Sequence, residues 1–98
     1  MRRTRSFSQD LSEKLRRPKF AQAFLTGLME GEDGLSPEDA LRQTIEIMGI
    51  KEFSQLSRVP APRVQEFLKK RRTLKPETLD RLLRPFRLRT KLVFEQAS

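Results

Sequence analysis

The chain has 98 residues, which fits one domain and at most a short appendage, and its net charge is +8. It contains no Cys and no His, which excludes disulfides and thiolate metal sites and removes the commonest general base and zinc ligand. We therefore expect no enzyme and no metal or other cofactor. The charge predicts a polyanionic partner, with nucleic acid foremost.

A membrane partner is not expected, because no apolar run approaches the roughly 20 residues that span a bilayer. The basic start at residues 1–5 is followed by no long apolar stretch, so it does not have the pattern of a secretory signal. The absence of Cys is compatible with the reducing cytoplasm, where we expect the protein to work.

Residues 1–34 are predicted to form an N-terminal helical segment. Ser8 is a candidate N-cap for a helix in which Leu11 and Leu15 have i, i+4 spacing. Pro18 breaks or restarts this helix. A second amphipathic stripe and the Gly-rich turn that ends it follow at 20–28 and 31–34.

The strongest helix signal covers residues 37–48. Ser36 is a suitable N-cap, Pro37 suits the first helical position, and Asp39 stands where the acid of a capping box is found. Gly49 follows at the position of a C-terminal αL residue. One apolar face is predicted, made of Ala40, Leu41, Ile45 and Met48.

Two short helices, 51–57 and 61–70, are predicted around a turn that contains two prolines. Phe53 and Leu56 are expected to face inward, and the small Ser54 stands where the two helices would approach most closely. The apolar residues that would pin the pair together are Phe53, Leu56, Val59, Val64 and Phe67. A supporting helix, a tight turn and a second helix are what a helix-turn-helix requires.

The last third of the chain is predicted to contain a basic loop at 71–75 and a helix from Pro76 to about Phe86. Residues 88–94 then alternate with period two, which indicates a short β-strand. Such a strand needs a partner, and we expect a second copy of the chain or a toxin-like protein. The predicted fold is all-α with a C-terminal strand, in three parts: 1–34, 35–87 and 88–98.

The residues around this helix pair resemble the Cro and lambda-repressor type of helix-turn-helix, the Xre family. The resemblance lies in 53–60, in Arg63-Val64 and Phe67-Leu68, in the loop and helix start at 71–79, and in the apolar tail at 88–94. It implies an all-α, five- to six-helix lambda-repressor-like fold in which 35–87 is the helix-turn-helix domain, and a dimeric DNA-binding transcription regulator.

Within that family the layout most resembles the antitoxin of HigA-type addiction modules, which have a start similar to Pro18-Lys19-Phe20-Ala21 before the helix-turn-helix. The resemblance implies a repressor of its own toxin–antitoxin operon that also binds a toxin protein. Double-stranded DNA, a second copy of the chain and a toxin are therefore the expected partners.

The helix at 61–70 is expected to lie in the major groove, with cations beside the phosphates. Arg63 could pair with guanine and Gln65 with adenine. The candidate DNA-binding residues are Lys51, Ala61, Pro62, Arg63, Gln65, Glu66, Lys69, Lys70, Arg71, Arg72 and Lys75.

Two features depart from the family pattern and keep an alternative open. Arg58 occupies a turn position where the family usually has Gly, and the second helix opens with Pro60, Ala61 and Pro62, which offer few side-chain hydrogen bonds. A protein-interaction module that has lost specific DNA recognition is therefore the alternative. A basic ribonuclease is a third hypothesis, disfavoured because the chain shows one strand signal where such folds need a sheet.

Overall fold

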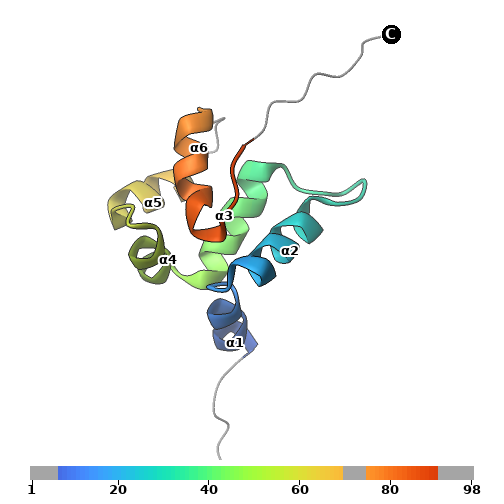
Figure 1. The fold of residues 1–98 in the computed structure, drawn as a ribbon, viewed down its shortest axis with the longest axis horizontal. Helices are drawn as coiled ribbons and strands as arrows, with labels where there is room; N and C mark the ends of the chain where they lie inside the picture. Colours follow the sequence, from blue (N-terminus) through green and yellow to red (C-terminus); the bar gives the residue numbers. More distant parts are fainter. Residues whose placement is uncertain (1–6, 70–74, 91–98) are drawn as a thin grey trace, which may run out of the picture.

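The structure, a computed structural model, describes residues 7–69 and 75–90 (Figure 1). This part of the chain contains helices and connecting segments and no strand, which confirms the all-α class. Its elements are α1 (Phe7–Lys14), α2 (Pro18–Met29), α3 (Pro37–Met48), α4 (Ile50–Ser57), α5 (Ala61–Lys69), α6 (Pro76–Leu83) and the 3₁₀ turn η1 (Arg84–Phe86). The predicted strand covers 88–94, and its residues 91–94 lie outside the described part; residues 88–90 are irregular.

The start of α3 is fixed by its own sequence. Its bounds are those predicted, Pro37 is the first helical residue, and the Ser36 Oγ accepts a hydrogen bond of 3.1 Å from the Asp39 N–H. The prediction for Gly49 was wrong in detail, because its φ of 105° and ψ of 138° lie outside the αL region. Gly49 is both the C-cap of α3 and the N-cap of α4, so the backbone is extended at this residue and does not form a left-handed turn.

Proline sets the start of α2 in the same way, since Pro18 is its first residue, as predicted. The predicted cap at Ser8 was wrong, because α1 already begins at Phe7 and Ser8 lies inside its first turn. After α2, Gly31 adopts a φ of 85° and the Leu35 N–H donates back to the Leu28 carbonyl at 2.8 Å, which reverses the chain toward α3.

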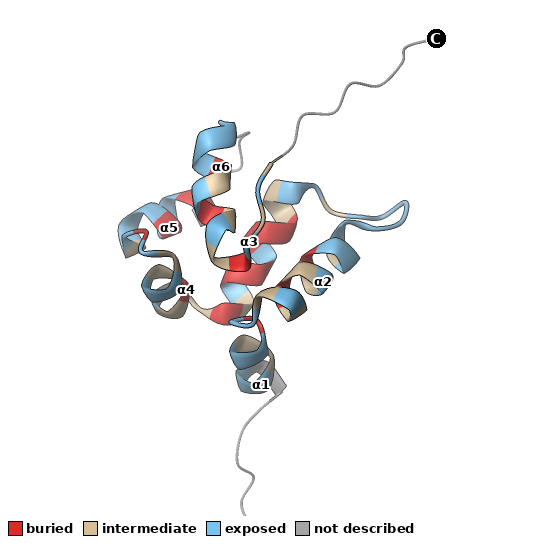
Figure 2. Ribbon diagram, viewed as in Figure 1, coloured by how far each residue is buried: buried red, intermediate tan, exposed pale blue. Residues whose placement is uncertain are grey.

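Helix α3 lies at the centre of the fold and contacts α1, α2, α4 and α5 (Figure 1). Figure 2 shows buried positions along α3 and on the sides of its neighbours that face it. The buried residues form one hydrophobic cluster: Leu15, Ala21, Leu25, Ala40, Leu41, Ile45, Met48, Phe53, Val59, Val64, Phe67, Leu79, Leu82 and Phe86. Segments 1–34 and 35–87 both contribute to this cluster, and the boundary between them remains a prediction.

Two hydrogen bonds join the first two helices to the rest of the fold. The Ser12 Oγ donates to the Met48 carbonyl at 2.8 Å, and the Gln22 amide donates to the Phe86 carbonyl at 2.9 Å. These bonds fasten α1 to the end of α3 and α2 to η1. Every helix within residues 7–69 and 75–90 is too short or too polar to cross a bilayer.

Candidate nucleic-acid interface

Helices α4 and α5 are joined by a three-residue turn, residues 58–60, that is closed by short hydrogen bonds. The Ser54 Oγ donates to the Val59 carbonyl at 2.6 Å, and the Val59 N–H donates to the Ser57 Oγ at 3.2 Å. Ser54 was expected to serve by its small size; the structure shows that its hydroxyl also binds across the turn. The turn therefore has a defined shape, which fixes the direction in which α5 leaves α4.

Arg58 lies at the corner of this turn in the left-handed region, with φ 64° and ψ 20°, and its N–H donates to the Ser54 carbonyl at 2.8 Å. A residue with a Cβ pays about 1 kcal/mol for this conformation, which glycine adopts without strain. The position that the sequence singled out for its missing glycine is thus one where glycine would relieve strain.

The inner side of α4 covers an arc of about 100° on a helical wheel, at 3.6 residues per turn. Its members are buried or half-buried: Ile50, Phe53, Ser54 and Ser57. Phe53 packs against Phe86, with ring centroids 5.9 Å apart. Leu56 lies about 60° beyond this arc and is 37% exposed, so the prediction that it faces inward was wrong.

The inner side of α5 is apolar and is anchored in the core. Val64 is fully buried, Phe67 is 6% exposed, and Ala61 and Leu68 are half-buried. These four residues lie within an arc of about 120°, so α5 packs along one side only. The helix is thus supported from behind over its whole described length.

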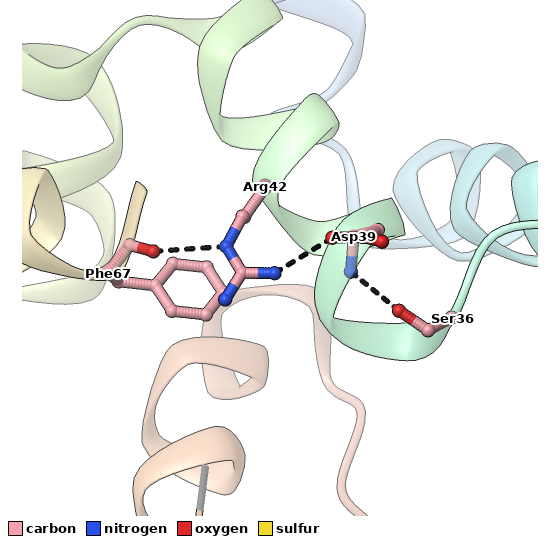
Figure 3. Close-up of polar contacts among 4 residues, drawn as sticks. All are labelled: Ser36, Asp39, Arg42 and Phe67. Atoms are coloured by element: carbon pink, nitrogen blue, oxygen red, sulfur yellow. Dashed lines mark hydrogen bonds and ion pairs between the residues drawn. The ribbon is translucent and has the colours of Figure 1, made fainter. Parts of the chain in front are cut away.

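A buried arginine of α3 holds the carboxyl-terminal end of α5 (Figure 3). The Arg42 Nε donates to the Phe67 carbonyl at 3.0 Å, and its Nη1 pairs with Asp39 at 2.8 Å. The guanidinium lies over the Phe67 ring, 4.6 Å from its centroid. The Phe67 carbonyl lies in the last turn of the described part of α5, so this hydrogen bond reaches that end of the helix. Arg42 satisfies that carbonyl and joins α5 to α3.

The outer side of α5 is polar and exposed (Figure 2). It presents Pro62, Arg63, Gln65, Glu66 and Lys69 to solvent. Of the other candidate residues, Ala61 is half-buried, while Lys51 on α4 and Lys75 at the N-cap of α6 are exposed. Lys70, Arg71 and Arg72 lie outside the described residues. The structure therefore brings four polar candidates together on one helix face: Arg63, Gln65, Glu66 and Lys69.

The first turn of α5 offers few donors to a ligand. Pro60 and Pro62 have no N–H, and the Pro60 carbonyl accepts from the N–H groups of Arg63 and Val64 at 2.9 and 3.1 Å. The binding chemistry of this helix therefore comes from its side chains and not from its backbone amides.

A cavity of about 430 Å³ opens between the α4–α5 turn and the end of α6. We call it the arginine pocket, after four of the residues that line it: Arg58, Arg63, Arg81 and Arg84. The remaining lining is Ser57, Val59 and Pro60. Sequence reasoning included Arg63 alone as a candidate for binding. The i, i+3 spacing of Arg81 and Arg84 was a usable signal that they share a side, but nothing in it indicated what they face.

Asp80 lies near this pocket and is engaged elsewhere. Its Oδ1 accepts from the Thr90 N–H at 2.6 Å and from the Thr90 Oγ1 at 2.7 Å. These two hydrogen bonds, assisted by the charges of Arg89 and Arg84, lower the pKa of the Asp80 carboxyl below its ordinary value. The carboxylate is thus held ionised and ties residue 90 to α6.

No family model, no curated protein and no solved structure matches this chain.

Proposed function

We propose that α4 and α5 form a helix-turn-helix and that the chain is a sequence-specific, double-stranded-DNA-binding transcription regulator. The observation that carries the proposal is the two-sided character of α5. Its inner side is anchored by Val64 and Phe67, while Arg63, Gln65 and Lys69 are exposed on its outer side. A helix held from behind, with an exposed polar face, has the arrangement needed to enter a major groove.

The side chains on this face divide by chemistry. Arg63 and Gln65 have planar donor groups that match the edges of guanine and adenine, so they are assigned to the bases. Lys69, at the end of α5, carries a mobile point charge suited to a phosphate. Base contacts supply specificity in this proposal, and phosphate contacts supply salt-dependent affinity.

The assembly we propose is a homodimer on a palindromic operator, because two such helices reach successive major grooves about 34 Å apart. The resemblance of the sequence to antitoxins adds a role: repression of its own operon and binding of a toxin protein. That role is tested by purifying the chain from its own cells, where a bound protein that arrests growth when expressed alone is the expected result.

DNA binding is tested by selecting ligands from random duplexes and measuring affinity for the enriched sequence over a range of salt concentrations. Gln65→Ala is expected to relax preference at one base pair, by about 5- to 100-fold, because a bidentate pair contributes about 1–3 kcal/mol of discrimination. Lys69→Gln is expected to weaken all sequences alike and to reduce the salt slope by about one.

The matched control is Lys19→Gln, which removes one exposed cation from α2, on the other side of α3 from α5 (Figure 1). It is expected to bind like the parent chain. Failure to enrich any sequence, or a salt slope that Lys69→Gln leaves unchanged, would refute the proposed use of α5.

A protein-interaction module is the second candidate, and two observations favour it. The start of α5 is poor in donors because of Pro60 and Pro62, and Leu56 exposes an apolar side chain on α4. This candidate predicts that no duplex is enriched and that Leu56→Lys abolishes binding of a protein partner. Under the DNA-binding proposal, Leu56→Lys leaves affinity for the duplex in place.

A further inference from the structure

The arginine pocket concentrates positive charge without a carboxylate of its own. Four guanidinium-bearing residues line it, and among the described residues that line it none is acidic. Each arginine side chain carries a positive charge, so the lining contributes four positive charges. A concave site with four fixed positive charges is suited to an anion.

One acidic side chain that interacts with an arginine of the pocket is already hydrogen-bonded to another residue. Asp80 interacts with the charge of Arg84, but its Oδ1 accepts both hydrogen bonds from Thr90, and Asp80 does not line the cavity. The other lining residues are neutral. Among the described residues that line the pocket, no carboxylate offsets the four arginines, so their charge is suited to an anionic ligand.

Arg58 supplies an independent observation. Its backbone lies in the left-handed region, which glycine adopts without steric strain, and Arg58 is one of the residues that line the cavity. A strained backbone at a residue that also lines a cavity points to a function for that residue. Arg87, the other non-glycine residue with positive φ in the described part, does not line the cavity, so it serves as a comparison.

We propose that the arginine pocket binds a phosphate group. The guanidinium fork donates two parallel hydrogen bonds to phosphate oxygens, which makes arginine the preferred residue for this ligand. Arg63 belongs both to the pocket and to the outer side of α5, so the two surfaces are continuous. If the proposed function holds, the phosphate is a backbone phosphodiester of the same duplex; a free polyphosphate offers the same chemistry.

The test compares two double variants that remove equal charge. Arg81→Gln with Arg84→Gln depletes the pocket, while Arg16→Gln with Arg17→Gln removes two exposed arginines between α1 and α2. In one arm, titration calorimetry measures binding of inorganic tripolyphosphate. In the other, affinity for the selected duplex is measured against salt concentration. Thermal unfolding checks that each variant remains folded.

The pocket variant is expected to bind tripolyphosphate about tenfold more weakly than the control variant. Its salt slope with the duplex is expected to fall by about one for each phosphate that the pocket no longer neutralises. Weaker binding in the duplex arm assigns the site to the DNA backbone, and weaker binding in the tripolyphosphate arm alone assigns it to a free phosphate. If both arms match the control variant, the pocket proposal is overturned.

Arg58→Gly provides a second variant that removes a guanidinium and relieves backbone strain, so a folding defect cannot explain its effect. It is expected to weaken phosphate binding in the same arm as the double variant, and unchanged binding by both variants overturns the proposal.

Failure of the pocket proposal can be distinguished from failure of the proposed function. If Lys69→Gln weakens duplex binding while the pocket variants do not, DNA binding stands without the pocket. If the parent chain binds no duplex, the proposed function fails, and the pocket proposal is then judged from the tripolyphosphate titrations alone.

Discussion

Arg42 and the arginines of the arginine pocket have the same side chain in opposite surroundings. Arg42 is buried on α3, where a carbonyl, a carboxylate and an aromatic ring surround its guanidinium (Figure 3). Arg58, Arg63 and Arg84 are exposed around a cavity that no described carboxylate lines. The first environment uses the charge to fix the position of a helix, and the second leaves the charge available to a ligand.

The comparison teaches that net charge alone does not locate a binding surface. A total of +8 includes arginines that stabilise the fold and arginines that face a cavity. Substitution separates the two groups. Replacing a buried arginine is expected to lower the free energy of unfolding, whereas replacing an exposed arginine is expected to change the affinity for a ligand and its dependence on salt.

The largest effect is expected from Arg42→Met, which removes the hydrogen bond to the Phe67 carbonyl and the ion pair with Asp39. We expect the free energy of unfolding to fall by about 1–3 kcal/mol, since the buried carbonyl of Phe67 is left without its donor. Urea denaturation followed by circular dichroism measures the loss. Gln43→Met, on the exposed side of α3, is the control and should stay within about 0.5 kcal/mol of the parent.

Ser54→Ala comes next, because it removes the 2.6 Å hydrogen bond to the Val59 carbonyl inside the turn. The expected cost is about 1–2 kcal/mol, the penalty for a buried acceptor left without a donor. Ser54→Thr keeps the hydroxyl, so it should lower the free energy of unfolding less than Ser54→Ala does. Equal stability of the alanine variant and the parent would show that the turn keeps its shape without this bond.

Arg58→Gly is expected to change stability and binding in opposite directions. Relief of the left-handed strain should raise the free energy of unfolding by up to about 1 kcal/mol, while loss of the guanidinium weakens phosphate binding. Arg87→Gly relieves the same strain at η1 outside the pocket, so it should stabilise the fold and leave binding unchanged. Weaker binding by both variants alike would remove the distinction between the two sites.

The smallest effect is expected from Asp80, whose pKa is lowered by its two hydrogen bonds from Thr90. A carboxyl with a lowered pKa stabilises the fold fully above its ordinary value of 3.8, and this contribution is lost as pH falls through the lowered pKa. The difference in unfolding free energy between the parent and Asp80→Asn should therefore shrink as the solution is acidified below that value. A difference that is independent of pH would contradict the pairing.

Local signals predicted most of the helices. Pro18, Ser36 and Pro37 mark helix starts by properties that act within a few residues, and the structure places α2 and α3 accordingly. Gly49 and Leu56 were predicted less well, because both depend on how α3 and α4 are joined and packed. The hydrogen bond from Arg42 to the Phe67 carbonyl, which we call the Arg42 clamp, joins residues 25 positions apart. The arginine pocket joins the α4–α5 turn to arginines more than 20 positions later in the chain. No local sequence pattern contains either feature.

The Arg42 clamp also sets the smallest piece of this protein that could be transplanted. Residues 50–69 contain both helices and their turn, but the carbonyl at the far end of α5 is satisfied by an arginine donated from α3. A graft that begins at Ile50 would therefore lack the hydrogen bond that holds the end of its second helix. The portable unit begins instead at Ser36, where the cap, the carboxylate and the arginine follow one another along a single helix.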